Sequence, residues 1–317
     1  MKETLLITGA KGQLGSVLAA HLRQRFGNDR VVATDLFTDP AATGIYEILD
    51  ATDLQALLKT IKKYSITQIY HMAAILSANG EADPFKTWNL NMNALFCVMD
   101  AACQSGVKKV FFPSSIAVYG TQSTKILTSQ NAYRDAGTVY GISKLAGENW
   151  AQYYFNRYGL DIRSLRYPGV VSHQSMPGGG TTDYAVAIFH AALQNKPYNC
   201  YLKKDTRLPM IYIDDAIRAA IELMDAPPEA VKVRSAYNLA GISFTPEEIA
   251  AKIKKQLPEF EINYTPDFRQ HIASLWPESI NDTNAREDWG WKNKFDLDDT
   301  VNTMIHHLKQ HYNSVKS

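Results

Sequence analysis

A tyrosine and a lysine stand four residues apart in the run Tyr140-Gly-Ile-Ser-Lys144. Residues at this spacing lie on one face of a helix, so the phenol and the ammonium are expected to project together. A free tyrosine has a pKa of about 10, and a neighbouring positive charge lowers the pKa of a phenol. The pair therefore predicts a general base that removes a hydroxyl proton.

Two serines, Ser114 and Ser115, follow the apolar run Phe111-Phe112-Pro113. In open parallel sheets, ligands bind beyond the carboxyl ends of the strands. If this run is a strand, both hydroxyls lie at the ligand-binding edge. We expect Ser114 and Ser115 to contact the substrate, with Ser115 holding the substrate oxygen while Tyr140 takes its proton.

Three glycines near the N-terminus form the pattern G-x-x-G-x-x-G between an apolar run and an amphipathic one. Glycines let the backbone turn tightly and approach a pyrophosphate, which lies against free amides at a helix N-terminus. An ordinary turn between a strand and a helix is the alternative. The expected phosphate loop comprises Gly9, Gly12, Gln13, Leu14 and Gly15.

Asp35, 20 residues after Gly15, favours the dinucleotide interpretation over an ordinary turn. A carboxylate there would accept hydrogen bonds from ribose hydroxyls and repel a 2′-phosphate, and Leu36 rather than an arginine follows it. NAD is therefore expected rather than NADP, unless Asp35 only caps a turn. Asp50, which Ala51 follows, would reach the adenine amino group or cap a turn.

The elements that position these residues alternate between short apolar runs and longer amphipathic ones. This alternation predicts parallel strands with right-handed crossovers, and so an α/β doubly wound parallel sheet of the Rossmann type. The expected strands are 5–8, 31–34, 69–72 and 109–113, and the expected helices are 13–26, 54–64 and 91–105.

After about Tyr167 this alternation is lost, although a helix is expected over 246–256. We expect residues 1–171 to form an NAD-binding domain and residues 172–317 to form mainly a smaller α/β substrate-binding domain. Part of 205–235 is expected to return to the first domain.

Composition excludes several classes of partner. The 317 residues carry 33 Lys and Arg against 32 Asp and Glu, so no global field attracts nucleic acid or an anionic membrane. Three widely spaced cysteines match neither a disulfide framework nor a zinc site. The apolar runs are far shorter than the roughly 20 residues of a membrane span, and an apolar strand pattern begins directly after Met1-Lys2-Glu3. We expect a cytoplasmic protein without metal, with a small-molecule partner.

The order of the motifs extends the interpretation to most of the chain. They are the glycine loop, Asp35, His71-Met72-Ala73-Ala74, Ser114-Ser115-Ile116-Ala117-Val118-Tyr119-Gly120, Tyr140-x-x-x-Lys144 and Arg166-Tyr167-Pro168-Gly169. This order resembles the extended short-chain dehydrogenases/reductases, which include nucleotide-sugar epimerases and dehydratases.

The resemblance implies roles for particular residues. Ser115, Tyr140 and Lys144 would be the catalytic hydroxyl, the base and the lysine that tunes the base. Asn91 would be a structural and relay asparagine beside the cofactor, although Ala94 replaces the usual glycine. Further NAD contacts would come from Leu36, Ala51, Ala73, Ala74, Tyr140, Lys144, Tyr167 and Pro168. A homodimer would form through the helices around 91–105 and 140–157.

The nucleotide-sugar members carry a diphosphate-binding arginine before an aromatic-I-H-V-x-D strand. Here Leu208 takes that position and Arg207 is one residue away, which argues against a UDP-sugar. Four segments instead resemble the short-chain L-threonine 3-dehydrogenases. They are Ala74 to Glu81, Ser175 to Val186, Leu208 to Tyr212 and Leu275 to Ile280.

An amino-acid substrate needs hydroxyls, amides and few charges. Ser77, Thr181 and Thr182 would supply hydroxyls, and the helix after Thr182 would offer amides to a carboxylate. Asp183 would balance the ammonium or cap that helix, and Trp276 would be an apolar lid or simply core. The triple glycine that ends at Gly180 would close over the substrate.

Together these features predict NAD-dependent oxidation of the Cβ hydroxyl of L-threonine to L-2-amino-3-oxobutanoate. Two alternatives stay open at this point. A UDP-sugar 4-epimerase or related enzyme uses the same scaffold, and a non-catalytic NAD-sensing protein keeps the glycine loop without the tyrosine and lysine.

Overall fold

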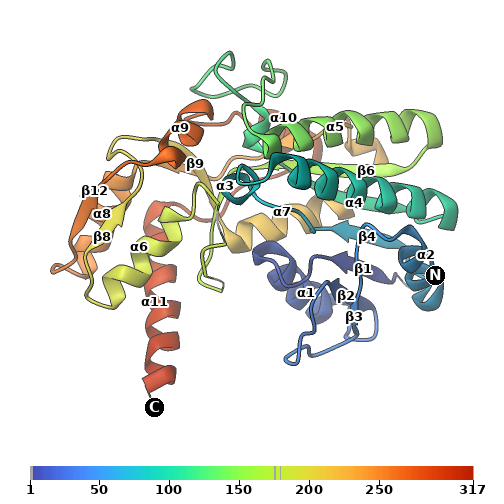
Figure 1. The fold of residues 1–317 in the computed structure, drawn as a ribbon, viewed down its shortest axis with the longest axis horizontal. Coiled ribbons are helices and arrows are strands. Elements are labelled where there is room, and N and C mark those ends of the chain that lie inside the picture. The colour runs from blue at the N-terminus through green and yellow to red at the C-terminus, as the bar shows by residue number, and fades with distance from the viewer. Residues whose placement is uncertain (1–2, 175, 179, 317) are drawn as a thin grey trace.

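Seven parallel strands form the main sheet of the computed structural model, which describes residues 3–174, 176–178 and 180–316. Their order β10-β6-β5-β4-β1-β2-β3 confirms the predicted doubly wound sheet (Figure 1). The strands are β1 (Leu5–Thr8), β2 (Val31–Asp35), β3 (Tyr46–Ile48), β4 (Gln68–His71), β5 (Lys109–Ser115), β6 (Asp161–Tyr167) and β10 (Tyr237–Asn238).

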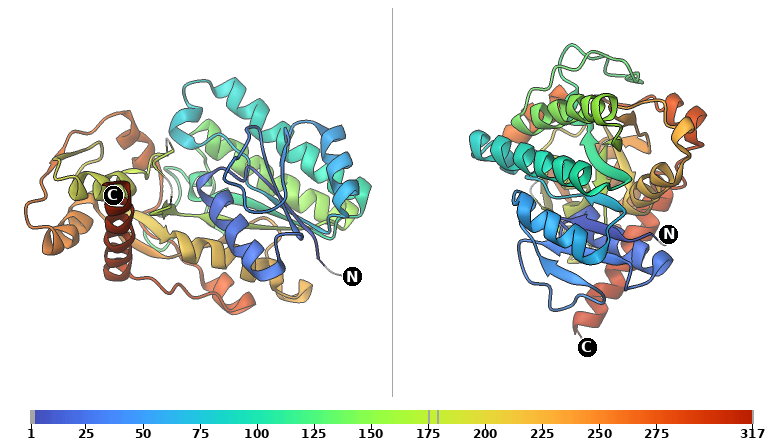
Figure 2. Two further views of the ribbon diagram at one scale, coloured as in Figure 1. Left: turned by 90° about the horizontal axis from the view of Figure 1, so that it is seen from below. Right: turned by 90° about the vertical axis from the view of Figure 1, so that its right-hand side faces the viewer.

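Helices cover both faces of this sheet (Figure 2). Alternate strand residues point to opposite faces, so Leu5 and Ile7 enter one apolar cluster and Leu6 enters another. The first cluster contains residues of α1 (Gln13–Phe26) and α7 (Ile213–Asp225). The second contains residues of α2 (Leu54–Tyr64), α4 (Pro84–Ser105) and α5 (Val139–Tyr158).

The second half of the chain builds two small sheets on one side of the main sheet (Figure 1). One comprises β7 (Gly169–Val171), β9 (Leu208–Tyr212) and β11 (Ile242–Phe244), and the other β8 (Tyr198–Cys200) and β12 (Ile262–Tyr264). Their helices are α6 (Tyr184–Leu193), α8 (Pro246–Gln256), α9 (Phe268–Leu275) and α11 (Leu297–Lys316). Short elements complete the chain: α3 (Ser77–Gly80), η1 (Ile116–Val118), η2 (Pro228–Ala230) and α10 (Thr283–Trp289).

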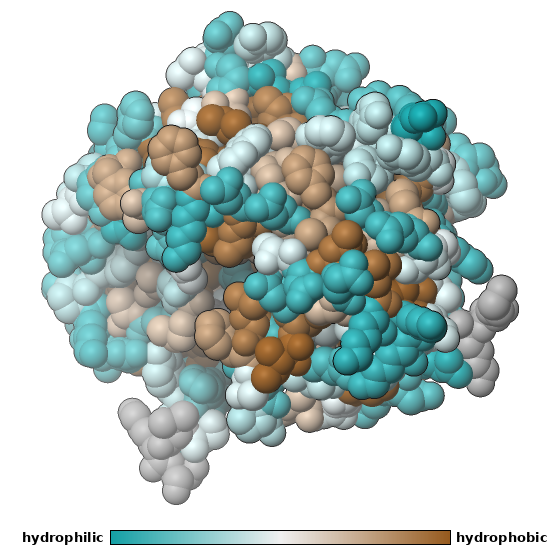
Figure 3. Space-filling view, turned by 45° about the vertical axis from the view of Figure 1, so that its right-hand side comes forward, coloured by the Kyte–Doolittle hydropathy of each residue, from teal (hydrophilic) through white to brown (hydrophobic). Residues whose placement is uncertain are grey.

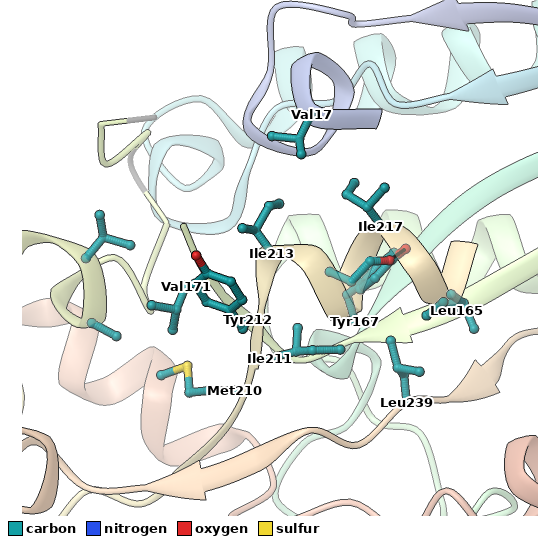
Figure 4. Close-up of a cluster of buried hydrophobic side chains, with 14 of the residues drawn as sticks. Val17, Leu165, Tyr167, Val171, Met210, Ile211, Tyr212, Ile213, Ile217 and Leu239 are labelled. Atoms are coloured by element: carbon teal, nitrogen blue, oxygen red, sulfur yellow. Dashed lines mark hydrogen bonds between the residues drawn. The ribbon is translucent and has the colours of Figure 1, made fainter. Parts of the chain in front are cut away.

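An apolar cluster joins the small sheets to the main one (Figure 4). Val17 of α1, Tyr167 of β6 and Ile217 of α7 belong to the same cluster as Ile211 of β9, and each is at most 5% exposed. Helix α7, within the predicted returning segment 205–235, contacts α1 and β6. β10 then pairs with Leu165 and Arg166 of β6. The division into domains at residue 171 stays a prediction.

Helix α4 begins at Pro84 rather than at Asn91, so the predicted start was seven residues late. Asp83 accepts a hydrogen bond from the Lys86 amide, and Pro84 takes the first helical position, where its missing N–H costs nothing. The first turns escaped the sequence pattern because they are largely exposed; Phe85 is 83% exposed.

Within the described part of the chain, no helix is long and apolar enough to cross a bilayer. The same residues contain no group of three or more His, Cys, Asp or Glu side chains that could hold a metal ion. Cys97, Cys103 and Cys200 are all free.

Candidate active site

Two adjoining cavities lie at the carboxyl ends of the main strands, and they share Gly12, Met72 and Ala74 in their walls. We call them the catalytic pocket and the cofactor cavity. Of the predicted site residues, the catalytic pocket is lined by Gly12, Gln13, Leu14, Gly15, Ala74, Ser77, Ser114, Ser115, Tyr140, Lys144, Tyr167, Pro168, Gly180, Thr181, Thr182, Asp183 and Trp276. The cofactor cavity is lined by Gly9, Gly12, Asp35, Leu36, Asp50, Ala51, Ala73 and Ala74.

The glycine loop has no space for side chains at two of its positions. A Cβ on Gly15 would lie 2.2 Å from the Gly9 carbonyl oxygen, and one on Gly9 would lie 2.6 Å from the Ala73 nitrogen. Gly9 also has φ +71°, which disfavours other residues. No side chain caps α1 after Gly12, so its N-terminus remains available to a phosphate group. This geometry fits a pyrophosphate.

Asp35 and Asp50 lie in the wall of the cofactor cavity, and both also stabilise their own turns. The Asp35 carboxylate accepts hydrogen bonds from the backbone amides of Leu36 at 2.8 Å and Lys11 at 2.9 Å. The Asp50 carboxylate accepts from the amide and hydroxyl of Thr52 at 2.8 and 2.7 Å. The capping role considered for each residue is therefore present, and it coexists with a position suited to a ribose or an adenine.

Ser115, Tyr140 and Lys144 meet in the catalytic pocket, as the sequence predicted for their positions. Ser115 is the last residue of β5, and its hydroxyl shares a hydrogen bond with the Tyr140 phenol. Tyr140 and Lys144 lie one helical turn apart at the start of α5. The Lys144 ammonium is 5.5 Å from the centroid of the Tyr140 ring.

Burial shifts the pKa values of Tyr140 and Lys144 so that the neutral form of each side chain is favoured. It raises the pKa of Tyr140 to about 12, against a small lowering by the Ser115 hydrogen bond. It also lowers the pKa of Lys144 to about 7. The expected lowering of the Tyr140 pKa by Lys144 is thus wrong for the protein alone, because burial disfavours the phenolate and the ammonium alike. A further positive charge is needed to favour the phenolate.

Ser114 is 2% exposed and already has a protein partner, while its predicted contact with the substrate stays a prediction. Its hydroxyl donates to the buried Glu148 carboxylate at 2.6 Å. Glu148 also accepts hydrogen bonds from Arg166 at 2.9 and 2.8 Å and from Arg134 at 2.9 Å. Ser114 lines the pocket, but its hydroxyl is committed to this ion-pair network.

Asn91 lies in the wall of neither cavity. Its side-chain oxygen accepts from the Ile75 amide at 2.9 Å, and its side-chain nitrogen donates to the Ile75 carbonyl at 3.2 Å. Ile75 itself lines the cofactor cavity. Asn91 therefore shapes that wall through the backbone of Ile75 rather than as a direct lining residue.

Residues 176–178 and 180–183, which we call the substrate loop, belong to the second half of the chain, and 180–183 line the catalytic pocket. The hydroxyls of Ser77 and Thr181 are 3.2 Å apart, and both residues are at most 5% exposed. Asp183 accepts from the Gly180 amide at 2.9 Å and makes no side-chain cap on α6. Positions 175 and 179 of the loop segment lie outside the described residues.

Trp276 is buried and also lines the catalytic pocket, and its role as a lid stays a prediction. Its carbonyl oxygen is 3.1 Å from the Lys125 ammonium, which also donates to the carbonyls of Ser274 and Leu275 at 3.1 and 2.6 Å. Lys125 thereby ties the end of α9 to the loop before α5. Sequence reasoning missed this residue because its partners are distant backbone carbonyls that no pattern of side chains indicates.

Comparisons with known proteins place the chain among enzymes. A Bos taurus protein named mitochondrial L-threonine 3-dehydrogenase is 45% identical to this chain over 308 residues. The match covers 96% of this chain and 82% of that protein. A structure titled as a GalE-like L-threonine dehydrogenase from Cupriavidus necator, in its holo form, has 49% identity and a TM-score of 0.95 over 96% of this chain and 99% of that one.

A more distant structure, a UDP-glucose 4-epimerase from Thermotoga maritima, is 18% identical with a TM-score of 0.86 over 98% of this chain and 99% of that one, and so shares the fold. The sequence profile described as the NAD dependent epimerase/dehydratase family matches residues 5–240. The chain belongs to the NAD-dependent epimerase/dehydratase family, and its relatives at 45% to 50% identity are L-threonine 3-dehydrogenases.

Proposed function

We propose that this chain oxidises the Cβ hydroxyl of L-threonine to L-2-amino-3-oxobutanoate, with NAD as the hydride acceptor. The observation that carries the proposal is the meeting of Ser115, Tyr140 and Lys144 with the hydroxyls of Ser77 and Thr181 in one pocket. An alcohol bound there lies between a candidate base and polar groups suited to an amino acid. Relatives named L-threonine 3-dehydrogenase support the choice of substrate.

NAD, when bound, supplies the hydride acceptor and a positive charge on its oxidised nicotinamide. The glycine loop would hold its pyrophosphate, and Asp35 its ribose hydroxyls, because Gly9 and Gly15 leave space only for close backbone approach. The Asp35 carboxylate would repel the 2′-phosphate of NADP. The glycine loop and Asp35 are therefore compatible with bound NAD.

Tyr140 and Ser115 would manage the substrate proton. Ser115 holds the Cβ hydroxyl against the Tyr140 phenolate, which takes the hydroxyl proton as the C–H bond at Cβ releases its hydride. The raised pKa of Tyr140, about 12 in the protein alone, means that the phenolate needs a nearby positive charge. A proton relay through Lys144 and water would then return Tyr140 to its starting state.

The amino-acid portion of the substrate would contact the substrate loop. Thr181 and Thr182 offer hydroxyls, and Asp183 is the carboxylate among the described lining residues of the catalytic pocket. A carboxylate in the wall suits the ammonium of an amino acid, and would repel a diphosphate. We therefore assign the ammonium to the side of the pocket nearest Asp183.

The environment of Arg207 disfavours the UDP-sugar alternative. Its guanidinium donates to the Ser243 carbonyl at 2.9 Å and pairs with Glu248, and it lines neither cavity. Leu208, at the position of the family's diphosphate-binding arginine, is fully buried. Retention of Ser115, Tyr140 and Lys144 in one pocket likewise disfavours a non-catalytic NAD sensor.

We also propose a homodimer through α4 and α5. Phe85, Trp88, Trp150, Tyr153 and Tyr158 on these helices are each at least 37% exposed, which is unusual for so many large aromatic side chains. Apolar patches lie among hydrophilic side chains on the face in Figure 3. One relative is titled as a monomeric L-threonine 3-dehydrogenase, so sedimentation of this protein is the deciding measurement.

A cytoplasmic location stays a prediction, since the bovine relative is named mitochondrial.

The function is tested by NADH formation at about 340 nm, where reduced nicotinamide absorbs, with L-threonine as the only substrate. L-serine, L-allo-threonine and UDP-glucose serve as comparisons. We expect net NADH with L-threonine, less with the other amino acids and none with UDP-glucose. No NADH with any amino acid, together with NAD binding, would revive the sensor.

A further inference from the structure

Residues 75–81, which we call the bridging segment, touch three parts of the active site. Ile75 lines the cofactor cavity, while Leu76 and Ser77 line the catalytic pocket. Asn91 fixes the start of the segment by its two hydrogen bonds to Ile75. The segment is therefore shared by the sites proposed for cofactor and substrate.

The middle of the bridging segment is bonded to the substrate loop. The hydroxyl pair of Ser77 and Thr181 is one contact, and the second is the side-chain amide of Asn79, which donates to the Gly178 carbonyl at 3.1 Å. These contacts join residues about one hundred positions apart, with sequence separations of 104 and 99. The bridging segment is thus hydrogen-bonded to the substrate loop at two positions.

The end of the bridging segment reaches the helix that carries Tyr140. The Glu81 carboxylate accepts a hydrogen bond from the backbone amide of Val139 at 2.8 Å. Val139 is the first residue of α5 and directly precedes Tyr140. Amides in a first helical turn have no partner within the helix, and a carboxylate there also favours the helix dipole.

The opposite side of the same turn is held by close packing. A Cβ on Gly141 would lie 2.1 Å from the Ala117 carbonyl oxygen, so α5 rests directly on the backbone that follows Ser115. Thr138 satisfies one more amide, that of Gly141, at 3.1 Å. Glu81 supplies the contact from the bridging segment. Its loss would remove the acceptor of the Val139 amide and leave the Thr138 and Ala117 contacts in place.

We propose that Glu81 is a positioning residue that couples the alignment of Tyr140 to the contacts between the bridging segment and the substrate loop. Glu81 touches neither cavity and acts through the Val139 amide, while Asn79 links the same segment to the loop. The proposal rests on the proposed function, because it assigns Tyr140 the role of base.

The test compares Glu81→Ala, which removes the acceptor, with Glu81→Gln, which keeps an acceptor oxygen without the charge. A misaligned base slows the chemical step, so we expect Glu81→Ala to lower kcat with L-threonine about tenfold while leaving the Kd for NAD within about twofold. Glu81→Gln should recover most of the turnover. Glu259→Ala, which removes another exposed glutamate, between α8 and β12, is the matched control and should match wild type.

A second measurement follows hydrogen exchange of the amides of residues 139–142 in the NAD-loaded protein. Exchange should be faster in Glu81→Ala than in wild type or Glu81→Gln, and equal exchange would overturn the proposal even if the wild-type chain oxidises no threonine. Wild-type turnover by Glu81→Ala, or a Glu81→Gln variant as slow as Glu81→Ala, would also overturn it.

Coupling is measured with Asn79→Ala alone and combined with Glu81→Ala. If both residues act through the bridging segment, the double variant should lose less kcat/KM than the product of the two single losses. Fully multiplicative losses would show that the two contacts act independently, and the proposed coupling would be wrong.

Discussion

The two halves of the active site are built in different ways. On the cofactor side, the glycine loop follows directly from β1, and its backbone is so closely packed that a Cβ on Gly15 would lie 2.2 Å from the Gly9 carbonyl oxygen. On the substrate side, the contacts are side-chain hydrogen bonds between segments far apart in sequence, such as Ser77 with Thr181. The first half is specified locally and the second half by tertiary packing.

Tyr140→Phe is expected to have the largest effect and to separate chemistry from cofactor binding. Loss of a general base lowers kcat by about a hundredfold to ten-thousandfold. The Kd for NAD should stay within about twofold of wild type, because the phenyl ring keeps the packing. Calorimetric titration with NAD and steady-state kinetics measure the two quantities. Tyr133→Phe, at a 63% exposed tyrosine outside both cavities, is the control.

Adding a methyl group to one glycine in each half tests the structural contrast directly. In Gly15→Ala the new Cβ would lie 2.2 Å from a carbonyl oxygen, whereas in Gly178→Ala the nearest atom is a leucine methyl at 3.9 Å. We expect Gly15→Ala to weaken NAD binding at least about tenfold and to lower the free energy of unfolding by about 1–3 kcal/mol. Gly178→Ala should change neither NAD binding nor the free energy of unfolding. Equal responses in calorimetry and NAD titration would remove the contrast.

The pH dependence of stability reports the buried Lys144 of the catalytic pocket. The pKa of Lys144 is lowered to about 7 in the folded chain, from 10.5 when exposed. Between those values the unfolded chain binds a proton that the folded chain does not, so the free energy of unfolding rises with pH. The free energy of unfolding of wild type, relative to that of Lys144→Met, should rise by up to about 4 kcal/mol between about pH 7 and 10. Urea unfolding without NAD measures this, and a difference independent of pH would contradict it.

Lys125→Met is expected to have the smallest effect and to act on the substrate side only. Without the ammonium, the carbonyls of Leu275 and Trp276 lose a charged donor, and the wall formed by Trp276 is held less firmly. The KM for L-threonine should rise about fivefold, with the Kd for NAD nearly unchanged. Lys125→Arg should recover much of the loss. A change in NAD affinity as large as the change in KM would assign Lys125 to the cofactor side.

The same contrast explains which features could be predicted from the sequence. The main sheet, its helices and the positions of Gly9, Asp35, Ser115 and Tyr140 follow from local periodicity and fixed spacings. The start of α4 escaped prediction because its first turns are exposed and show no apolar stripe.

The remaining features depend on contacts that spacing does not encode. Ser114 and Ser115 are adjacent and chemically identical, yet the partner of Ser114 is Glu148, which packing alone brings near. The raised pKa of Tyr140 depends on how deeply both it and Lys144 are buried, whereas their spacing predicted only their proximity. The roles of Lys125 and Glu81 rest on backbone groups of distant segments.

The central claim is that hydride leaves Cβ of L-threonine for NAD while Tyr140 takes the hydroxyl proton. The most direct measurement uses L-threonine carrying deuterium at Cβ, with NAD in excess, and mass spectrometry of the recovered nicotinamide. The account predicts NADH that carries the deuterium, formed in step with the amino ketone. NADH without deuterium, or the absence of net NADH formation with L-threonine, would contradict it.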